Sequence, residues 1–205
     1  MALVLKLGGS LYESGRLDGV LERVAAADVP VIVVPGGGPF ADAVRAEYQS
    51  GRIDEATAHD LAVLAMQQMA ILMARRAPVL RTVETEAQIG KAVAERSSAI
   101  WLPWRMARAA GDIARDWSMT SDGMAAWLAR RLESVGLRLP VVLVKSCEIP
   151  QHASARALAD SGIVDAWFAR IVTESGPAWR VVSADDPNGL SDVLRRPIDG
   201  AHIAC

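Results

Sequence analysis

The sequence predicts an α/β protein, a three-layer α/β/α sandwich built around a mostly parallel central sheet. Two observations carry this prediction: short apolar runs alternate with segments of helical spacing, and the apolar runs show little polar alternation. Continuous apolar runs are typical of strands that have helices on both faces. The length of 205 residues suffices for one substantial core. We therefore expect a single domain over residues 1–205.

Six short segments are predicted as strands because their apolar residues continue without polar alternation. They span residues 2–7, 30–35, 79–83, 99–102, 140–145 and 179–183. Seven other segments have helical spacing, at about 16–27, 39–49, 55–76, 85–96, 120–135, 153–161 and 188–196. This alternation favours parallel strands joined by crossover helices.

Composition narrows the classes of partner and compartment. With 51% hydrophobic and 22% charged residues, the chain is typical of a soluble globular protein. A net charge of −2 gives no broad attraction to nucleic acid or to an anionic membrane, so we expect neither as a partner. Glutamines and arginines interrupt the most apolar segment, residues 60–80, which excludes a spanning helix. Cys147 and Cys205 form neither a metal-ligand cluster nor a disulfide framework, which favours a cytoplasmic location.

The first predicted strand carries a lysine near its end and then breaks into two glycines and a serine: Lys6, Gly8, Gly9 and Ser10. A lysine in a buried strand is costly unless an anion or a carboxylate receives its charge. Adjacent glycines let backbone N–H groups approach a ligand closely. The pattern indicates a bound anion, although an edge-strand lysine followed by an ordinary turn explains the same residues.

A triple glycine, Gly36, Gly37 and Gly38, follows the second predicted strand. An anion could rest on this bare main chain and on the dipole of the helix that begins there, or the glycines could form a flexible turn. Together with Ala41, these residues also match the dinucleotide fingerprint G-x-G-x-x-A. That match makes a dinucleotide-dependent oxidoreductase an alternative, but the fingerprint usually follows the first strand of such folds.

A third junction lies at Thr120, Ser121 and Asp122. Thr120 or Ser121 can cap a helix, and Asp122 then lies in its first turn, where the helix dipole favours an aspartate in any protein. A later strand ends in Lys145, the same strand-terminal place that Lys6 occupies. Two such lysines could hold the oxygens of a transferring phosphoryl group while a carboxylate orients them.

Taken in order, these motifs resemble the amino acid kinase superfamily, which includes acetylglutamate, aspartate, uridylate and isopentenyl phosphate kinases. The resemblance implies ATP as the donor and Mg²⁺ as its companion ion, with an acceptor-binding half at 1–110 and a nucleotide-binding half at 111–205. It implies that Lys6 and Lys145 stabilise the transferring phosphoryl group and that Asp122 organises the two lysines.

The resemblance also implies two sets of binding residues. Phosphate and ATP would meet Gly8, Gly9, Ser10, Thr120, Ser121 and Ser146. The acceptor would meet Gly36, Gly37, Gly38, Arg45 and His59. No protein side chain is expected as a metal ligand. Arg45 could instead be a solvent-facing helical arginine, and His59 a satisfied histidine near a helix start.

Three stretches, GGGPFADAVR, ATAHDLAVLAMQQ and DWSMTSDGMAAWLA, are most similar to a short branch of the superfamily that acts in methanofuran biosynthesis. The resemblance implies an ATP-dependent kinase that converts [5-(aminomethyl)furan-3-yl]methyl phosphate into the diphosphate. The rival is a non-catalytic nucleotide or oxyanion binder, because the superfamily also includes storage and sensing proteins and fold does not fix function. We expect a homodimer or a higher homo-oligomer.

Overall fold

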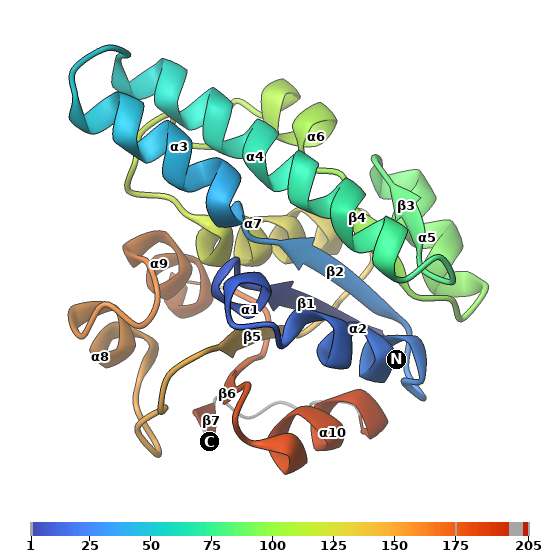
Figure 1. Ribbon diagram of the computed structural model, residues 1–205. Helices are drawn as coiled ribbons and strands as arrows, with labels where there is room; N and C mark the ends of the chain where they lie inside the picture. Colours follow the sequence, from blue (N-terminus) through green and yellow to red (C-terminus); the bar gives the residue numbers. More distant parts are fainter. Residues whose placement is uncertain (1, 175, 197–202, 205) are drawn as a thin grey trace.

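The computed structural model describes residues 2–174, 176–196 and 203–204, so Cys205 lies outside the described residues. Helices cover both faces of a central sheet, which gives the three layers that the sequence predicts (Figure 1). None of the helices in the described ranges combines the length and the apolar composition that crossing a membrane requires.

Over the described residues the sheet contains seven strands in the order β3-β4-β2-β1-β5-β6-β7, and each neighbouring pair is parallel. The strands are β1 (Leu3–Leu7), β2 (Val31–Pro35), β3 (Arg81–Val83), β4 (Ala99–Trp101), β5 (Val141–Lys145), β6 (Trp179–Ser183) and β7 (Ile203–Ala204). The predicted α/β class, the parallel sheet and the six longer strands are confirmed. The two residues of β7 are too few to give a periodic signal.

The helices are α1 (Ser10–Glu13), α2 (Leu17–Ala25), α3 (Gly38–Gln49), α4 (Glu55–Arg76), α5 (Glu86–Ala94), α6 (Trp104–Ala109), α7 (Ser121–Glu133), α8 (Ala155–Asp160), α9 (Ala166–Glu174) and α10 (Pro187–Arg195). Each of the seven predicted helices is present. The prediction lacks α1, α6 and α9. The first two are only four and six residues long, which is too short for periodicity to reveal.

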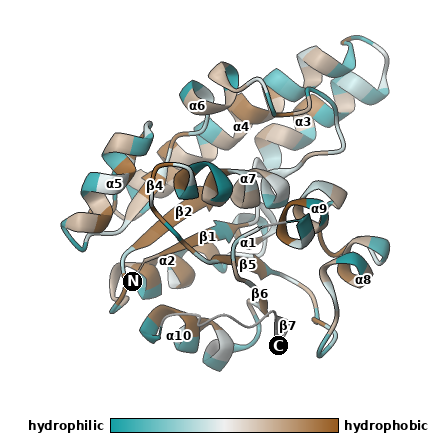
Figure 2. Ribbon diagram, turned by 180° about the vertical axis from the view of Figure 1, so that it is seen from behind, coloured by the Kyte–Doolittle hydropathy of each residue, from teal (hydrophilic) through white to brown (hydrophobic). Residues whose placement is uncertain are grey.

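Strand β1 contributes to two separate hydrophobic cores because its side chains alternate between the faces of the sheet. Leu5 and the residues two positions before and after it pack in the core that includes α2 and α10. Val4 packs in the other core, which includes Trp127 of α7. Lys6 follows Val4 at a spacing of two and so lies on the α7 face. Figure 2 shows the central strands as a hydrophobic layer between the helices.

Strand β1 lies between β2 and β5, and the chain leaves it toward one side of the sheet and returns on the other. The register pairs Leu7 with Pro35 on one side and with Val144 on the other, so three strands end at the same edge. In open parallel sheets, ligands bind at this kind of topological switch point. The fold therefore brings the three sequence motifs to one place.

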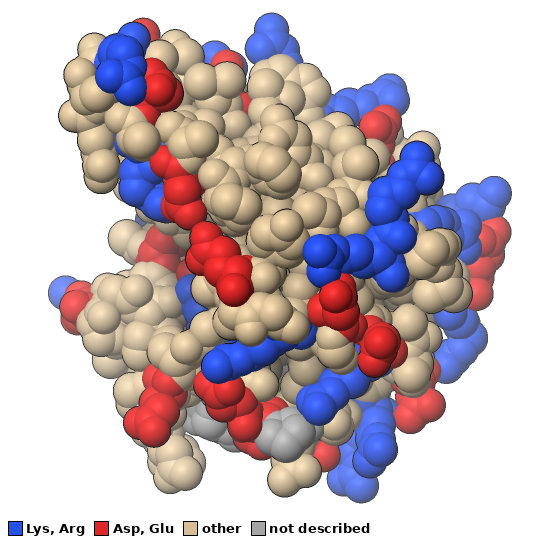
Figure 3. All heavy atoms as spheres, in the orientation of Figure 1, with Lys and Arg blue, Asp and Glu red and all other residues tan. Residues whose placement is uncertain are grey.

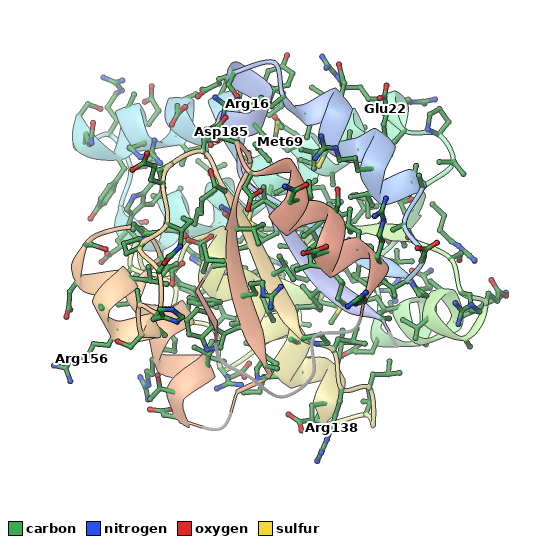
Figure 4. The ribbon with its side chains drawn as sticks, turned by 90° about the horizontal axis from the view of Figure 1, so that it is seen from below. Arg16, Glu22, Met69, Arg138, Arg156 and Asp185 are labelled. Carbon is green, nitrogen blue, oxygen red and sulfur yellow. The ribbon has the colours of Figure 1, made fainter. Side chains whose placement is uncertain are left out.

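An ion pair lies on the face of the sheet that α2 and α10 cover. Arg16, at the start of α2, lies 2.8 Å from Asp185, which precedes α10. Figure 4 shows the two labelled side chains side by side. Both side chains are substantially exposed, so the pair contributes at most about 1 kcal/mol to stability. The pair connects the α1–α2 turn to the β6–α10 turn.

Candidate active site

A cavity of about 480 Å³ lies at the carboxyl ends of β1, β2 and β5. Helices α3 and α4 form one wall, and the start of α7 with the segment before α9 forms the other. Figure 3 shows the surface indented on the left, below the α3–α4 hairpin. Residues from both predicted halves of the chain line the cavity.

Two lysines meet on one carboxylate at the base of this cavity. Nζ of Lys6 lies 2.9 Å from Oδ1 of Asp122, and Nζ of Lys145 lies 2.5 Å from Oδ2 of the same residue. Asp122 is 3% exposed and Lys6 is 6% exposed. The lysines come from neighbouring parallel strands, and the aspartate comes from the first turn of α7. The structure therefore brings together the three residues that the sequence singles out as catalytic.

The electrostatics of the three residues are mutually dependent. Burial raises the pKa of Asp122, but the charges of Lys6 and Lys145 outweigh burial and hold that pKa below its ordinary value. The pKa of Lys145 is lowered, first by burial and then by the charge of Lys6, and the Asp122 carboxylate only partly opposes this. Together, the two ammonium groups of Lys6 and Lys145 and the carboxylate of Asp122 have a net charge of +1. These three residues therefore favour the binding of an anion.

The glycines at the first two strand ends allow the two loops to touch. A Cβ atom on Gly9 would lie 2.2 Å from Cα of Gly38, and one on Gly36 would lie 2.8 Å from N of Gly9. Gly38 has a φ of +53°, a conformation that favours glycine. Much of the glycine pattern therefore serves loop packing, a role that the sequence reasoning did not consider. Gly8 leaves room for the Lys6 ammonium, since its Cβ would lie 3.2 Å from Nζ.

Three hydroxyl-bearing residues, Ser10, Ser146 and Thr120, lie close along the chain to the residues of the lysine cluster. The Oγ atoms of Ser10 and Ser146 lie 3.0 Å apart and connect the loop after β1 to the loop after β5. Thr120 is the N-cap of α7 and accepts a hydrogen bond from N of Asp122. Ser121, Thr120 and Ser10 line the cavity, as do Gly37 and the other two residues of the triple glycine.

Arg45 and His59 also line the cavity, on its α3–α4 wall. Arg45 forms an ion pair with Asp42, and its guanidinium group lies 5.8 Å from the ring centre of Trp117. His59 is 6% exposed, and its Nδ1 lies 3.3 Å from the backbone oxygen of Asp116. Arg45 thus has a carboxylate partner already, and an acceptor anion would compete with Asp42 for it.

Sequence reasoning missed several residues of this cavity. Asp165 and Glu13 line it but belong to no motif, whereas Asp116 and Trp117 lie in the stretch DWSMTSDGMAAWLA but are not among the predicted site residues. Their contacts join segments far apart along the chain, and single-sequence patterns do not reveal such contacts. The composition does hold a signal for this site, because the chain contains only three lysines and two of them are in the cluster.

A magnesium ion fits this site only if most of its ligands are substrate phosphates and water molecules. Across the described ranges, no three His, Cys, Asp or Glu side chains are grouped to hold a metal ion. Mg²⁺ usually binds through one or two carboxylates, substrate phosphates and water, so such a cluster is not required. The acidic side chains that line the cavity are compatible with that arrangement.

The fold and the site define an α/β/α protein with two lysines on one buried carboxylate at the switch point of its sheet. The model of the amino acid kinase family matches residues 1–139, and the chain belongs to this family.

A curated relative and two solved structures resemble this chain. The [5-(aminomethyl)furan-3-yl]methyl phosphate kinase of Methanocaldococcus jannaschii is 25% identical over 132 residues, which are 63% of this chain and 61% of the relative. The matched segment thus spans less than two thirds of that relative.

The structure of UMP kinase from Bacillus anthracis matches with a TM-score of 0.69 and 13% identity. The match covers 99% of this chain and 93% of the UMP kinase chain. That of isopentenyl phosphate kinase has a TM-score of 0.65 and 13% identity, and covers 96% and 98%. Identities this low support the fold alone. The two structures agree with the three-layer architecture described above.

Proposed function

We propose that this protein transfers the γ-phosphoryl group of ATP to a small acceptor that carries a phosphate or a carboxylate. The observation that carries the proposal is the contact of Lys6 and Lys145 with one buried carboxylate at the edge where the glycine loops meet. Phosphoryl transfer needs alignment and charge stabilisation more than covalent chemistry. Two fixed ammonium groups facing an open cavity supply that charge.

In the proposed reaction, an oxygen of the acceptor attacks the γ-phosphorus in line. The new O–P bond forms as the bond to the β-phosphate oxygen breaks, and ADP leaves with the bonding electrons. The acceptor oxygen is already ionised at neutral pH, so no general base is required. Lys6 and Lys145 stabilise the charge on the moving group, and Asp122 fixes their separation. Bound magnesium would neutralise charge on the phosphates of the nucleotide.

The proposed acceptor is [5-(aminomethyl)furan-3-yl]methyl phosphate, which would become the diphosphate. The similarity to the kinase from Methanocaldococcus jannaschii supports this choice. On the α3–α4 wall, Arg45 and His59 offer N–H donors to an anionic acceptor, which would have to displace Asp42 from Arg45. We further propose that residues 1–110 receive the acceptor, that residues 111–205 bind ATP, and that the protein acts in the cytoplasm as a homodimer or a higher homo-oligomer.

A coupled ADP-release assay tests this proposal. The acceptors are the furan methyl phosphate, isopentenyl phosphate, UMP and acetylglutamate, each with ATP and Mg²⁺. We expect the furan compound to give the highest kcat/KM. A higher value for another acceptor would overturn the substrate assignment but leave phosphoryl transfer intact.

A second measurement separates the enzyme from its rivals. Calorimetry that shows ATP binding, together with no ADP release from any acceptor, would favour the non-catalytic nucleotide or oxyanion binder. Binding of NAD(H) would favour the oxidoreductase. The contacts of Gly36 and Gly38 argue against the oxidoreductase, because these glycines pack on the neighbouring loop and on Met69.

A further inference from the structure

Asp165 lies just before α9, on the wall of the cavity, and no sequence motif includes it. Its Oδ2 accepts hydrogen bonds from Oγ1 and N of Thr120, at 2.6 and 3.0 Å, and from N of Gly123, at 2.8 Å. Its Oδ1 accepts one from N of Phe168, at 2.7 Å. One carboxylate therefore joins the first turn of α7 to the first turn of α9.

The partners of Asp165 on α7 flank the residue that binds both lysines. Thr120 lies two positions before Asp122 and caps its backbone N–H, and Gly123 follows it directly. The fit is tight, because a Cβ atom on Gly123 would lie 2.8 Å from Oδ1 of Asp165 and 2.9 Å from Cβ of Trp167. The turn that carries Asp122 is thus held on both sides by a residue more than 40 positions later in the chain.

We propose that Asp165 is a positioning residue, which holds the first turn of α7 so that the Asp122 carboxylate faces Lys6 and Lys145. The kinetic part of this inference rests on the proposed function. Both oxygens of Asp165 already accept hydrogen bonds from its own chain. Asp122 therefore remains the carboxylate that contacts the two lysines.

The charge of Asp165 also acts on the cluster. Burial and then the charge of Lys6 lower the pKa of Lys145, whereas the carboxylate of Asp122 and, to a smaller extent, the charge of Asp165 raise it. Burial raises the pKa of Asp165 itself, so its charge acts on Lys145 only above that raised pKa. Removing that charge should lower the pH at which Lys145 loses its proton. A residue that merely stabilised the fold would not move this titration.

Asp165→Asn tests the proposal by kinetics. The amide has the size of the carboxylate, but its NH₂ group would face N–H and O–H donors and could not accept their hydrogen bonds. We expect kcat at saturating ATP and acceptor to fall by about 10²-fold, with a smaller change in KM. Asp112→Asn is the matched control. Asp112 bonds Trp127 and Arg130 farther along α7, outside the cavity, so this variant should keep the wild-type kcat.

The proposal can also be tested without an activity assay, by measuring how the three lysines of the chain titrate. Acetylation of each Nζ as a function of pH, read by mass spectrometry, reports the three titrations separately, with the exposed Lys91 as an internal standard. In Asp165→Asn the profile of Lys145 should move to lower pH, while that of Lys91 stays fixed. The same experiment can be done if no acceptor is found, so failure of the proposed function does not mask failure of this inference.

Thr120→Val provides a second variant in case Asp165→Asn does not fold. It removes the hydroxyl that donates to Asp165 and that also accepts from N of Asp122, so it should lower kcat in the same direction, by a smaller factor. A folded Asp165→Asn protein with the kcat and the Lys145 profile of the wild type would overturn the inference. If neither substitution changes kcat, Asp165 serves the fold alone and the inference is equally wrong.

Discussion

Nζ of Lys145 lies 2.5 Å from Oδ2 of Asp122, and the lysine reaches it from the end of β5 while the aspartate sits in the first turn of α7. The second oxygen of the same carboxylate faces Lys6. A buried carboxylate between two ammonium groups is costly to assemble and strongly destabilising to break. The chain therefore carries a net positive cluster at the base of its cavity, which an anionic substrate would neutralise.

Asp122→Asn should destabilise the protein markedly, because it leaves two buried ammonium groups without a counter-charge. We expect the free energy of unfolding to fall by about 3–5 kcal/mol, measured by urea denaturation at neutral pH. The control is Asp112→Asn, whose ion pair with Arg130 is largely exposed and should matter far less. Equal stability of the two variants would contradict the structural role of Asp122.

The alkaline pH dependence of activity should reflect the lowered pKa of Lys145. Only the charged form stabilises the moving phosphoryl group, and burial with the charge of Lys6 makes that form lose its proton at lower pH than an ordinary lysine. We therefore expect kcat/KM to fall as pH rises through this lowered pKa. The fall in kcat should come at higher pH, because bound phosphates favour the ammonium form.

The measurement is a pair of pH profiles, one for kcat/KM and one for kcat, over neutral to alkaline pH. Coincident alkaline limbs in the two profiles would show that bound substrate does not change the titrating group. That result would argue against direct contact between Lys145 and the phosphates.

Gly9→Ala should damage both stability and activity, because the new Cβ would lie 2.2 Å from Cα of Gly38 and would push the two loops apart. Gly19→Ala is the matched control: Gly19 lies within α2, and apart from its chain neighbours and the nearby helix backbone, a Cβ atom added there would meet nothing within 4 Å. The control should gain about 0.5–1 kcal/mol of stability from its helical position. Thermal unfolding and ADP release measure both effects, and a Gly9→Ala protein with wild-type values would show that the loops need not touch.

The sequence predicts most of the fold because its periodic signals are local. The strand that ends at Lys145 and the helix that begins after Thr120 have runs of apolar residues long enough to show their period. Helix α9 is the instructive omission, since Phe168, Ile171 and Val172 have helical spacing and are buried, yet the prediction does not include this helix. Asp165, just before it, could have served as a start signal.

The candidate site is predictable only in part. Lys6 and Lys145 stand at strand ends, which parallel pairing brings to one edge, so their proximity follows from the topology. The contacts of Asp165 with Thr120 and Gly123 follow from no local pattern, because they depend on how α9 packs against α7. The same holds for Trp117, whose stacking on Tyr48 requires tertiary packing.

The kcat of Lys145→Met at saturating ATP and acceptor tests the central claim most directly, with Lys91→Met as the control because Lys91 is the exposed lysine of the chain. Loss of one group that stabilises charge in a transition state lowers kcat by about 10²–10³-fold, and we predict a fall of that size for Lys145→Met with wild-type kcat for Lys91→Met. A folded Lys145→Met protein that turns over as fast as the control would contradict the account.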